Sequence, residues 1–144
     1  GDDPFGDGRQ RAEAWAAERS LGEDCVFCGI RRDVPRLMAG SDVFVMSSLW
    51  EGLGLVFLEA MSMGLPVLGS RVSAIPEVVM EGETGLLVPP GDPIALAEGM
   101  ERMIMDPGLG ESLKAAGPGM VRERFSLDRM VEETLAIYEE LLKE

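Results

Sequence analysis

The sequence has no histidine and only two cysteines, Cys25 and Cys28. The cysteines form a single Cys-x-x-Cys pair, and without a second pair or a histidine they cannot complete a zinc site. They lie in a run predicted as a strand rather than at a helix start, so the context of a redox motif is also missing. On a strand their spacing points the side chains to opposite faces, which disfavours a disulfide. We expect ordinary reduced packing thiols and a reducing, cytoplasmic compartment.

Basic residues are also scarce, because 13 Lys and Arg stand against 26 Asp and Glu, a formal net charge of −13. This balance argues against nucleic acid or an anionic membrane surface as a partner. It disfavours anionic small ligands as well. The affinity for such a ligand would have to come from local backbone amides and a few cations.

Long apolar runs are absent too. No run approaches the length of a membrane span, and we expect no signal peptide. The sequence contains no internal repeat and no low-complexity linker. With 144 residues, 46% of them hydrophobic and 27% charged, the composition is that of an ordinary soluble globular protein. We therefore predict a single domain over residues 1–144.

One stretch, residues 47–64, concentrates the chemistry and reads SSLWEGLGLVFLEAMSMG. A strand-like run over 42–46 leads into it, and a helix-like run over 55–63 ends it. Strand, glycine-rich turn and helix together build an anion site, because free N–H groups and the positive end of the helix dipole point at the turn. Gly52 and Gly54 would let a ligand approach the backbone closely.

Two glutamates, Glu51 and Glu59, bracket this turn. On a fully helical segment their spacing would span roughly 12 Å, comparable to a sugar-diphosphate-ribose. One carboxylate could accept hydrogen bonds from sugar hydroxyls and the other from ribose hydroxyls. The alternative is that Glu59 is a helix-surface residue and Glu51 a charge favourable to the helix dipole. The spacing alone favours that alternative, and it gains weight only from the strand-turn-helix around it.

The rest of the chain alternates strand-like and helix-like segments. Apolar runs predict strands over residues 24–30, 42–46, 66–70 and 85–88, with 42–46 buried. Helical spacing and caps predict helices over 9–20, with Trp15 on the inner face, and over 33–39, 55–63, 74–80, 93–105 and 109–124, with a break near 117–119. A last helix, capped by Ser126, carries an apolar stripe. This alternation predicts a parallel sheet covered on both faces, with ligands beyond the carboxyl ends of its strands.

In order, the motifs resemble the donor site of the retaining nucleotide-sugar glycosyltransferases of the GT-B fold, family 4. The family pattern is Asp, a hydrophobic run and Pro-Ser, then Glu-Gly, an aromatic or aliphatic residue and Gly, then Glu-Ala-Met and Gly-x-Pro-Val. The matching segments here are residues 42–48, 51–54, 59–61 and 64–67. Further matches, from Gly6-Asp7-Gly8 and residues 26–29 to 75–79, 82–88 and 125–126, extend the resemblance over most of the chain. Ser47 departs from the family, which usually has proline there.

The resemblance implies a Rossmann-like α/β sheet with strand order 3-2-1-4-5-6, of which this chain lacks the first two strands. The strand over 24–30 would then have lost its neighbour. It could pair directly with the next strand, take a strand from another chain, or leave an exposed edge. The missing part normally carries the arginine and lysine that neutralise the donor diphosphate. The acceptor-binding half is missing as well, so we expect the chain alone to be incomplete as an enzyme.

The resemblance also implies roles for single residues. Glu51, the catalytic position, would contact donor-sugar hydroxyls, and Glu59 would hold the ribose diol. Backbone N–H groups for sugar and phosphate would come from Gly52, Leu53, Gly54 and Leu55. Ile30 and Arg31 would lie near the nucleobase, although an ordinary strand-to-helix loop explains them equally well. Trp50 would either pack at the turn or wall the sugar pocket. No cofactor and no metal is expected, and transfer would be a same-face displacement with retention.

Several functions remain open at this point. The chain could be the donor domain of a glycosyltransferase that works with an N-terminal acceptor-binding domain or a separate chain. It could be a donor-binding subunit that is inactive alone, or an interaction module that has lost catalysis. Self-association is also expected, because strand edges would stay unpaired. A nicotinamide dehydrogenase is disfavoured, since no G-x-G-x-x-G follows the first strand.

Overall fold

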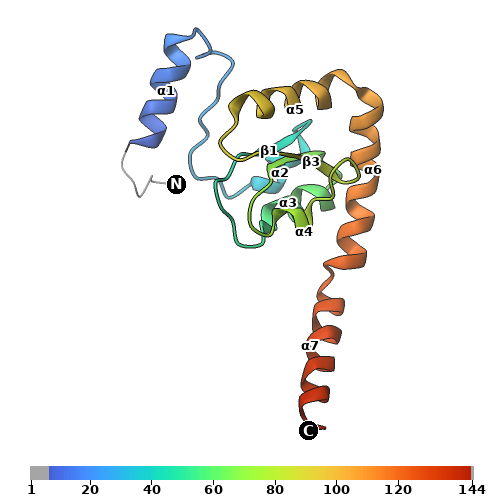
Figure 1. The fold of residues 1–144 in the computed structure, drawn as a ribbon. Coiled ribbons are helices and arrows are strands. Elements are labelled where there is room, and N and C mark those ends of the chain that lie inside the picture. Colours follow the sequence, from blue (N-terminus) through green and yellow to red (C-terminus); the bar gives the residue numbers. More distant parts are fainter. Residues whose placement is uncertain (1–6, 144) are drawn as a thin grey trace. The chain divides into compact units, whose positions relative to one another are not determined.

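The computed structural model describes residues 7–143 (Figure 1). The chain divides into two compact units, Gly1–Pro35 and Arg36–Glu144, which are described one after the other. Gly6 of the Gly-Asp-Gly motif lies outside the described residues. The expectation of a single domain over the whole chain stays a prediction.

The first unit contains one long helix, α1 (Gly8–Glu18), close to its predicted bounds. Trp15 does not lie on an inner face, because 54% of its surface is exposed. The guanidinium carbon of Arg19 lies over the Trp15 ring, 4.1 Å from its centre. Of the described residues of this helix, only Ala16 is buried. The inner-face prediction for Trp15 is therefore wrong, and a cation–π contact takes the place of core packing.

The strand predicted over residues 24–30 does not form. These residues are exposed and pair with none of the described strands. A strand satisfies its backbone groups through a neighbouring strand, so an apolar run without such a neighbour does not become one. Cys25 and Cys28 are free and exposed, which shows that the expectation of packing thiols was wrong.

The second unit is built on a parallel sheet of three strands in the order β1-β2-β3. The strands are β1 (Phe44–Met46), β2 (Val67–Ser70) and β3 (Gly85–Val88), so three of the four predicted strands are present. Every residue of β2 and β3 is buried. The residues of β1 are only half-buried, contrary to the prediction of a buried strand. Edge position alone does not explain this, because β3 also pairs on one side only and is buried throughout.

Helices cover both faces of this sheet (Figure 1). On one face lie α3 (Leu55–Ser62), α4 (Ile75–Val78) and the second half of α6 (Pro107–Arg124), and α2 (Val34–Ala39) contributes Met38 to the same core. On the other face lies α5 (Pro93–Met105). Neighbouring residues of β2 point to opposite cores, as strand geometry requires. Val67 packs with Phe57 and Ile75, whereas Leu68 packs with Met103 and Leu113. The prediction of a sheet covered on both faces is confirmed.

The ends of the later helices follow local chemistry. The Asp92 carboxylate accepts hydrogen bonds from the Ile94 and Ala95 amides at 3.1 and 3.0 Å, and α5 ends at Met105 as predicted. Ser126 caps α7 (Leu127–Leu141) through a bond of 3.3 Å from the Arg129 amide.

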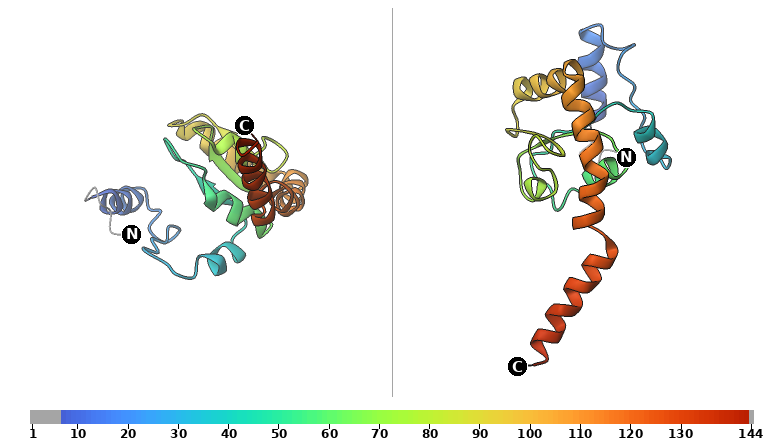
Figure 2. Two further views of the ribbon diagram at one scale, coloured as in Figure 1. Left: turned by 90° about the horizontal axis from the view of Figure 1, so that it is seen from below. Right: turned by 90° about the vertical axis from the view of Figure 1, so that its right-hand side faces the viewer.

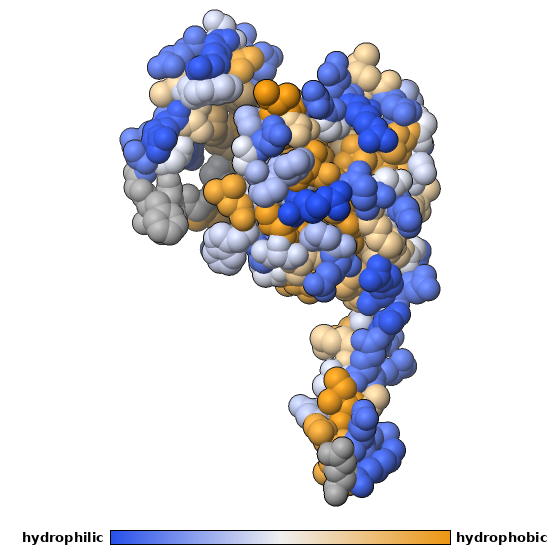
Figure 3. All heavy atoms as spheres, in the orientation of Figure 1, coloured by the Kyte–Doolittle hydropathy of each residue, from blue (hydrophilic) through white to orange (hydrophobic). Residues whose placement is uncertain are grey.

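Two features of α6 and α7 differ from expectation. The predicted break in α6 is absent, and the helix runs unbroken through Pro118. Close packing on α3 holds this part of α6, since a Cβ on Gly117 would lie only 3.0 Å from the Met61 carbonyl oxygen. The apolar stripe of α7 covers no core, because none of its described residues is buried. Figure 2 shows α7 following α6, and Figure 3 shows apolar side chains at its surface.

Candidate functional site

The carboxyl ends of the strands meet at one edge of the sheet because the strands are parallel. Three loops leave this edge, over residues 47–54 after β1, 71–74 after β2 and 89–92 after β3. The first of these loops leads directly into α3, which confirms the predicted strand-turn-helix. Ligands of open parallel sheets bind at such an edge.

The N-terminus of α3 presents unpaired backbone amides. Gly54 is its N-cap, with φ 72° and ψ 46°, and no side chain caps the helix. The Phe57 amide donates to the Gly54 carbonyl at 2.9 Å, while the amides of Leu55 and Val56 belong to the first turn and have no intrahelical acceptor. Leu55 is 62% exposed. These amides and the helix dipole can therefore receive an anion from solvent.

Glu51 is half-buried at the start of this turn. Its carboxylate oxygen Oε1 accepts a hydrogen bond from the Ser48 hydroxyl at 3.4 Å. Its backbone amide donates to the hydroxyl of Ser73, in the loop after β2, at 3.3 Å. The loop after β2 thus holds the main chain of Glu51, and Ser48 of its own loop holds its carboxylate. Ser48 and Ser73 were not predicted as site residues. The contact of Ser73 joins positions 22 residues apart, whose proximity no local pattern reveals. Ser48 is only three positions from Glu51, so its place in the same loop was the signal that could have found it.

Glu59 lies one turn into α3 and is exposed. Its backbone carbonyl accepts a bond of 2.7 Å from the Ser62 hydroxyl. Within residues 7–143, no ion pair or hydrogen bond engages its carboxylate. The structure therefore places Glu51 in the turn before α3 and Glu59 within α3, and the free amides lie between them in the chain. The predicted amide donors are also on this segment: Gly52, Leu53, Gly54 and Leu55.

Ile30 and Arg31 belong to the first unit, and both are exposed. Arg31 donates from Nε and Nη2 to the two carboxylate oxygens of Asp33, at 2.8 and 2.7 Å. This hydrogen bonding lowers the pKa of Asp33 and raises the pKa of Arg31. The bidentate pair braces the chain just before α2 and leaves fewer Arg31 donors for a ligand. A contact of either residue with a nucleobase stays a prediction.

Trp50, beside Glu51, is 77% exposed. It is therefore not a packing residue of the turn, which was one of its two expected roles. Leu49, also in this loop, is 71% exposed. Their side chains give the rim of the turn an apolar surface that a bound ligand could cover.

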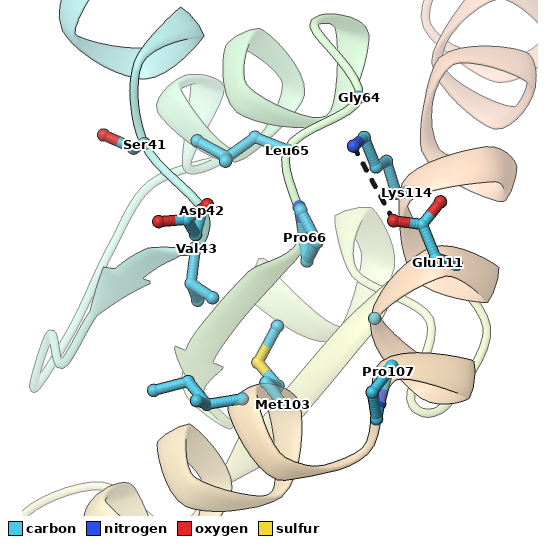
Figure 4. Close-up of a pocket in the computed structure, with 12 residues that line it drawn as sticks. Ser41, Asp42, Val43, Gly64, Leu65, Pro66, Met103, Pro107, Glu111 and Lys114 are labelled. Atoms are coloured by element: carbon cyan, nitrogen blue, oxygen red, sulfur yellow. Dashed lines mark ion pairs between the residues drawn. The ribbon is translucent and has the colours of Figure 1, made fainter.

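Hollows are found at both edges of the sheet. A cavity of about 750 Å³ lies at the amino ends of β1 and β2, lined among others by Asp42, Gly64 and Pro66 (Figure 4). Two acids, Asp42 and Glu111, and one lysine, Lys114, line this cavity. Because Lys114 is already paired with Glu111 at 3.8 Å, the cavity is unsuited to an anion. A smaller cavity of about 280 Å³ lies at the carboxyl edge, where Ser47, Ser70 and Asp92 contribute to its lining.

No group of three or more His, Cys, Asp or Glu side chains in the described part of the chain is placed to hold a metal ion. Metal-independent ligand binding stays a prediction. Among residues 7–143, no helix combines the length and the apolar character that crossing a membrane would need.

The sequence matches the family model of the glycosyl transferases group 1 over residues 4–106. It is 34% identical over 119 residues to the N-acetyl-alpha-D-glucosaminyl L-malate synthase of Bacillus anthracis, a match that covers 83% of this chain and 31% of that protein. It is 37% identical over 105 residues to the D-inositol 3-phosphate glycosyltransferase of Streptomyces bingchenggensis, covering 72% of this chain and 22% of that protein. The chain thus spans about a third or less of the length of these curated relatives.

Solved structures resemble the fold over most of the chain. The sucrose-phosphate synthase of Thermosynechococcus elongatus superposes with a TM-score of 0.83 at 34% identity, over 98% of this chain and 37% of that one. HepE of Anabaena in complex with UDP gives a TM-score of 0.84 at 28% identity, over 90% of this chain and 37% of that one. A complex of HepE with UDP-glucose gives a TM-score of 0.83. The predicted Rossmann-like α/β fold is confirmed.

Proposed function

The chain belongs to the group 1 glycosyltransferases, and from that membership we propose that it is the donor-binding part of a retaining enzyme. It binds a nucleotide-diphosphate sugar, and an N-terminal acceptor-binding domain or a separate chain supplies the acceptor. The observation that carries this proposal is the position of the free amides of α3 between Glu51 and Glu59 at the carboxyl edge. HepE, solved with UDP and with UDP-glucose, supports the ligand class.

In the proposed complex, each part of the donor meets a group of matching chemistry. The amides of Gly52, Leu53, Gly54 and Leu55 hold the phosphates and the adjoining sugar oxygens. The Glu59 carboxylate accepts hydrogen bonds from both hydroxyls of the ribose, and the Glu51 carboxylate accepts hydrogen bonds from the hydroxyls of the donor sugar. For the nucleobase, the family resemblance alone assigns Ile30 and Arg31.

Catalysis in this proposal is electrostatic. When the bond between sugar and phosphate breaks, negative charge develops on the departing nucleotide diphosphate. The fixed amides and dipole of α3 stabilise that charge without reorganising, and no metal ion is needed. The acceptor attacks from the same face, so the configuration at the sugar carbon is retained. The proposal also places the protein in the cytoplasm.

The test is calorimetric titration of the chain with UDP and with UDP-glucose. Glu59→Gln should weaken both ligands, because both contain the ribose. Glu51→Gln should weaken only UDP-glucose. Each loss should be about 1.5–3 kcal/mol, the range for hydrogen bonds to a charged group. Glu98→Gln, a change at an exposed position of α5 outside the proposed site, is the control and should leave both affinities unchanged.

Two results would contradict the proposal. An equal loss for both ligands in both glutamate variants would mean that the assigned roles are wrong. No loss of affinity in either variant would mean that residues 47–59 belong to an ordinary strand-turn-helix without a role in ligand binding. It would favour the alternative that the chain is an interaction module without catalysis.

A further inference from the structure

Two non-glycine residues have a left-handed backbone among the residues described, Ser20 with φ 58° and Ser73 with φ 47°. This region is disfavoured for residues with a side chain, and serine has no special preference for it. Strain of this kind persists only where the surrounding structure imposes it, and it is often found next to functional groups. Ser73 differs from Ser20 in one respect, because its hydroxyl accepts the hydrogen bond of the Glu51 amide.

The loop that carries Ser73 is fastened to the sheet. The Arg71 amide donates to the Val88 carbonyl at 2.7 Å, which ties the start of the loop to the end of β3. The Arg71 side chain donates to Glu81 at 3.1 Å, and the same carboxylate oxygen accepts the Leu87 amide at 2.7 Å. Two links from β3 therefore hold Arg71 in place, and Ser73 follows it by two residues.

The other end of the loop is held as well. The Ile75 amide donates to the Val72 carbonyl at 3.0 Å, and Ile75 is fully buried in the core beside α3. Ser73 thus lies between two fixed points, and its hydroxyl is directed at the backbone of Glu51. Ser48 donates to the carboxylate of the same glutamate.

We propose that Ser73 is a positioning residue for Glu51, which it acts on through the Glu51 backbone amide without touching the donor. The inference rests on the proposed function, since Glu51 is there the group that binds the sugar. Ser73 fixes the main chain of the turn and Ser48 orients the carboxylate. The strained backbone at Ser73 is what brings its hydroxyl within reach of the turn.

The test compares three variants of the chain. Ser73→Gly removes both the hydroxyl and the strain, Ser73→Ala removes only the hydroxyl, and Ser20→Gly removes strain away from the turn. Thermal unfolding should show Ser73→Gly at least as stable as Ser73→Ala, since glycine accepts a positive φ. Both Ser73 variants should weaken UDP-glucose by about two- to tenfold, as expected for one hydrogen bond, and leave UDP unchanged. Ser20→Gly should change neither affinity.

Amide hydrogen exchange, measured by NMR on the same variants, separates this inference from the proposed function. The Glu51 amide should exchange faster in both Ser73 variants and at the parent rate in Ser20→Gly. Unchanged exchange would overturn the positioning role, whatever the ligand data show. Faster exchange with unchanged UDP-glucose affinity would also overturn it, provided that Glu51→Gln weakens that ligand. If Glu51→Gln has no effect, the proposed function fails, and the ligand part of this inference fails with it.

Discussion

Gly54 is the N-cap of α3, and its backbone conformation sets the residue at which the helix begins. Its φ of 72° is a conformation that residues with a side chain rarely adopt, and a Cβ there would lie 3.1 Å from the Phe57 ring. Phe57 is fully buried and cannot easily move away. Glycine is therefore required at this position for the helix to begin where it does.

Gly54→Ala should lower the free energy of unfolding by about 1–2 kcal/mol, the cost of a side chain in the left-handed region. Gly52→Ala is the matched control, because its φ is not positive and a Cβ there would meet nothing within 4 Å. Urea denaturation of both variants measures the difference. Equal stability of the two variants would show that the conformation of Gly54 is not what defines the start of α3.

Single residues could be predicted from the sequence where a local pattern of neighbours determines their position. Glu51, Gly54 and Glu59 stand at the expected places on the turn and helix because chain spacing alone sets them there. Ser73 was not predicted, since its bond to Glu51 joins residues 22 positions apart. Only the fold brings its loop to the turn.

Among the secondary-structure elements, those that depend on local chemistry match their predictions. Asp92 and Ser126 cap their helices, and the apolar runs that became β2 and β3 lie between helices as expected. The run over 24–30 failed because a strand requires a partner, which local pattern cannot supply. Pro118 failed to break α6 because packing against α3 outweighs its local preference.

The helix α7 is amphipathic, but its apolar stripe has no core to cover. The large exposed side chains on this helix and just after it are Leu127, Met130, Val131, Leu135, Ile137, Tyr138, Leu141 and Leu142. Together with the outer edge of β1, they give the second unit apolar and unpaired surface. We predict that the chain self-associates through this surface.

Sedimentation velocity over a range of concentrations tests that prediction. Leu135→Glu places a charge in the stripe and should shift the distribution toward monomer. Ala136→Glu adds the same charge at a neighbouring exposed position outside the list of large apolar side chains, and should leave the distribution unchanged. A parent chain that stays a single monomeric species at every concentration would contradict the prediction.

For the whole molecule, the charge balance and the proposed ligand act against each other. A net charge of −13 repels a nucleotide diphosphate, so binding depends on where local groups reverse that field. The free amides at the N-terminus of α3 provide a local positive potential. The cavity at the amino edge does not, because two acids and one lysine line it. We therefore expect the ligand at the carboxyl edge, although the hollow at the other edge is larger.

The family and the parallel, doubly covered sheet could be predicted from sequence, because motif order and the alternation of segments encode them. The number of strands and the edge position of β1 could not, since both depend on pairing between distant segments. The two hollows are likewise products of packing, and no run of residues such as 64–66 indicates one in advance.

Amide chemical-shift mapping shows where the donor binds and therefore tests its assignment to the carboxyl edge. The labelled chain is titrated with UDP and then with UDP-glucose. We expect UDP to shift the amides from Gly52 to Glu59, because it carries the phosphates and the ribose, and UDP-glucose to shift the Glu51 amide as well. The amides of Asp42, Gly64 and Lys114, at the amino-edge cavity, should not move. Shifts centred on that cavity, or none at the start of α3, would contradict donor binding at the carboxyl edge.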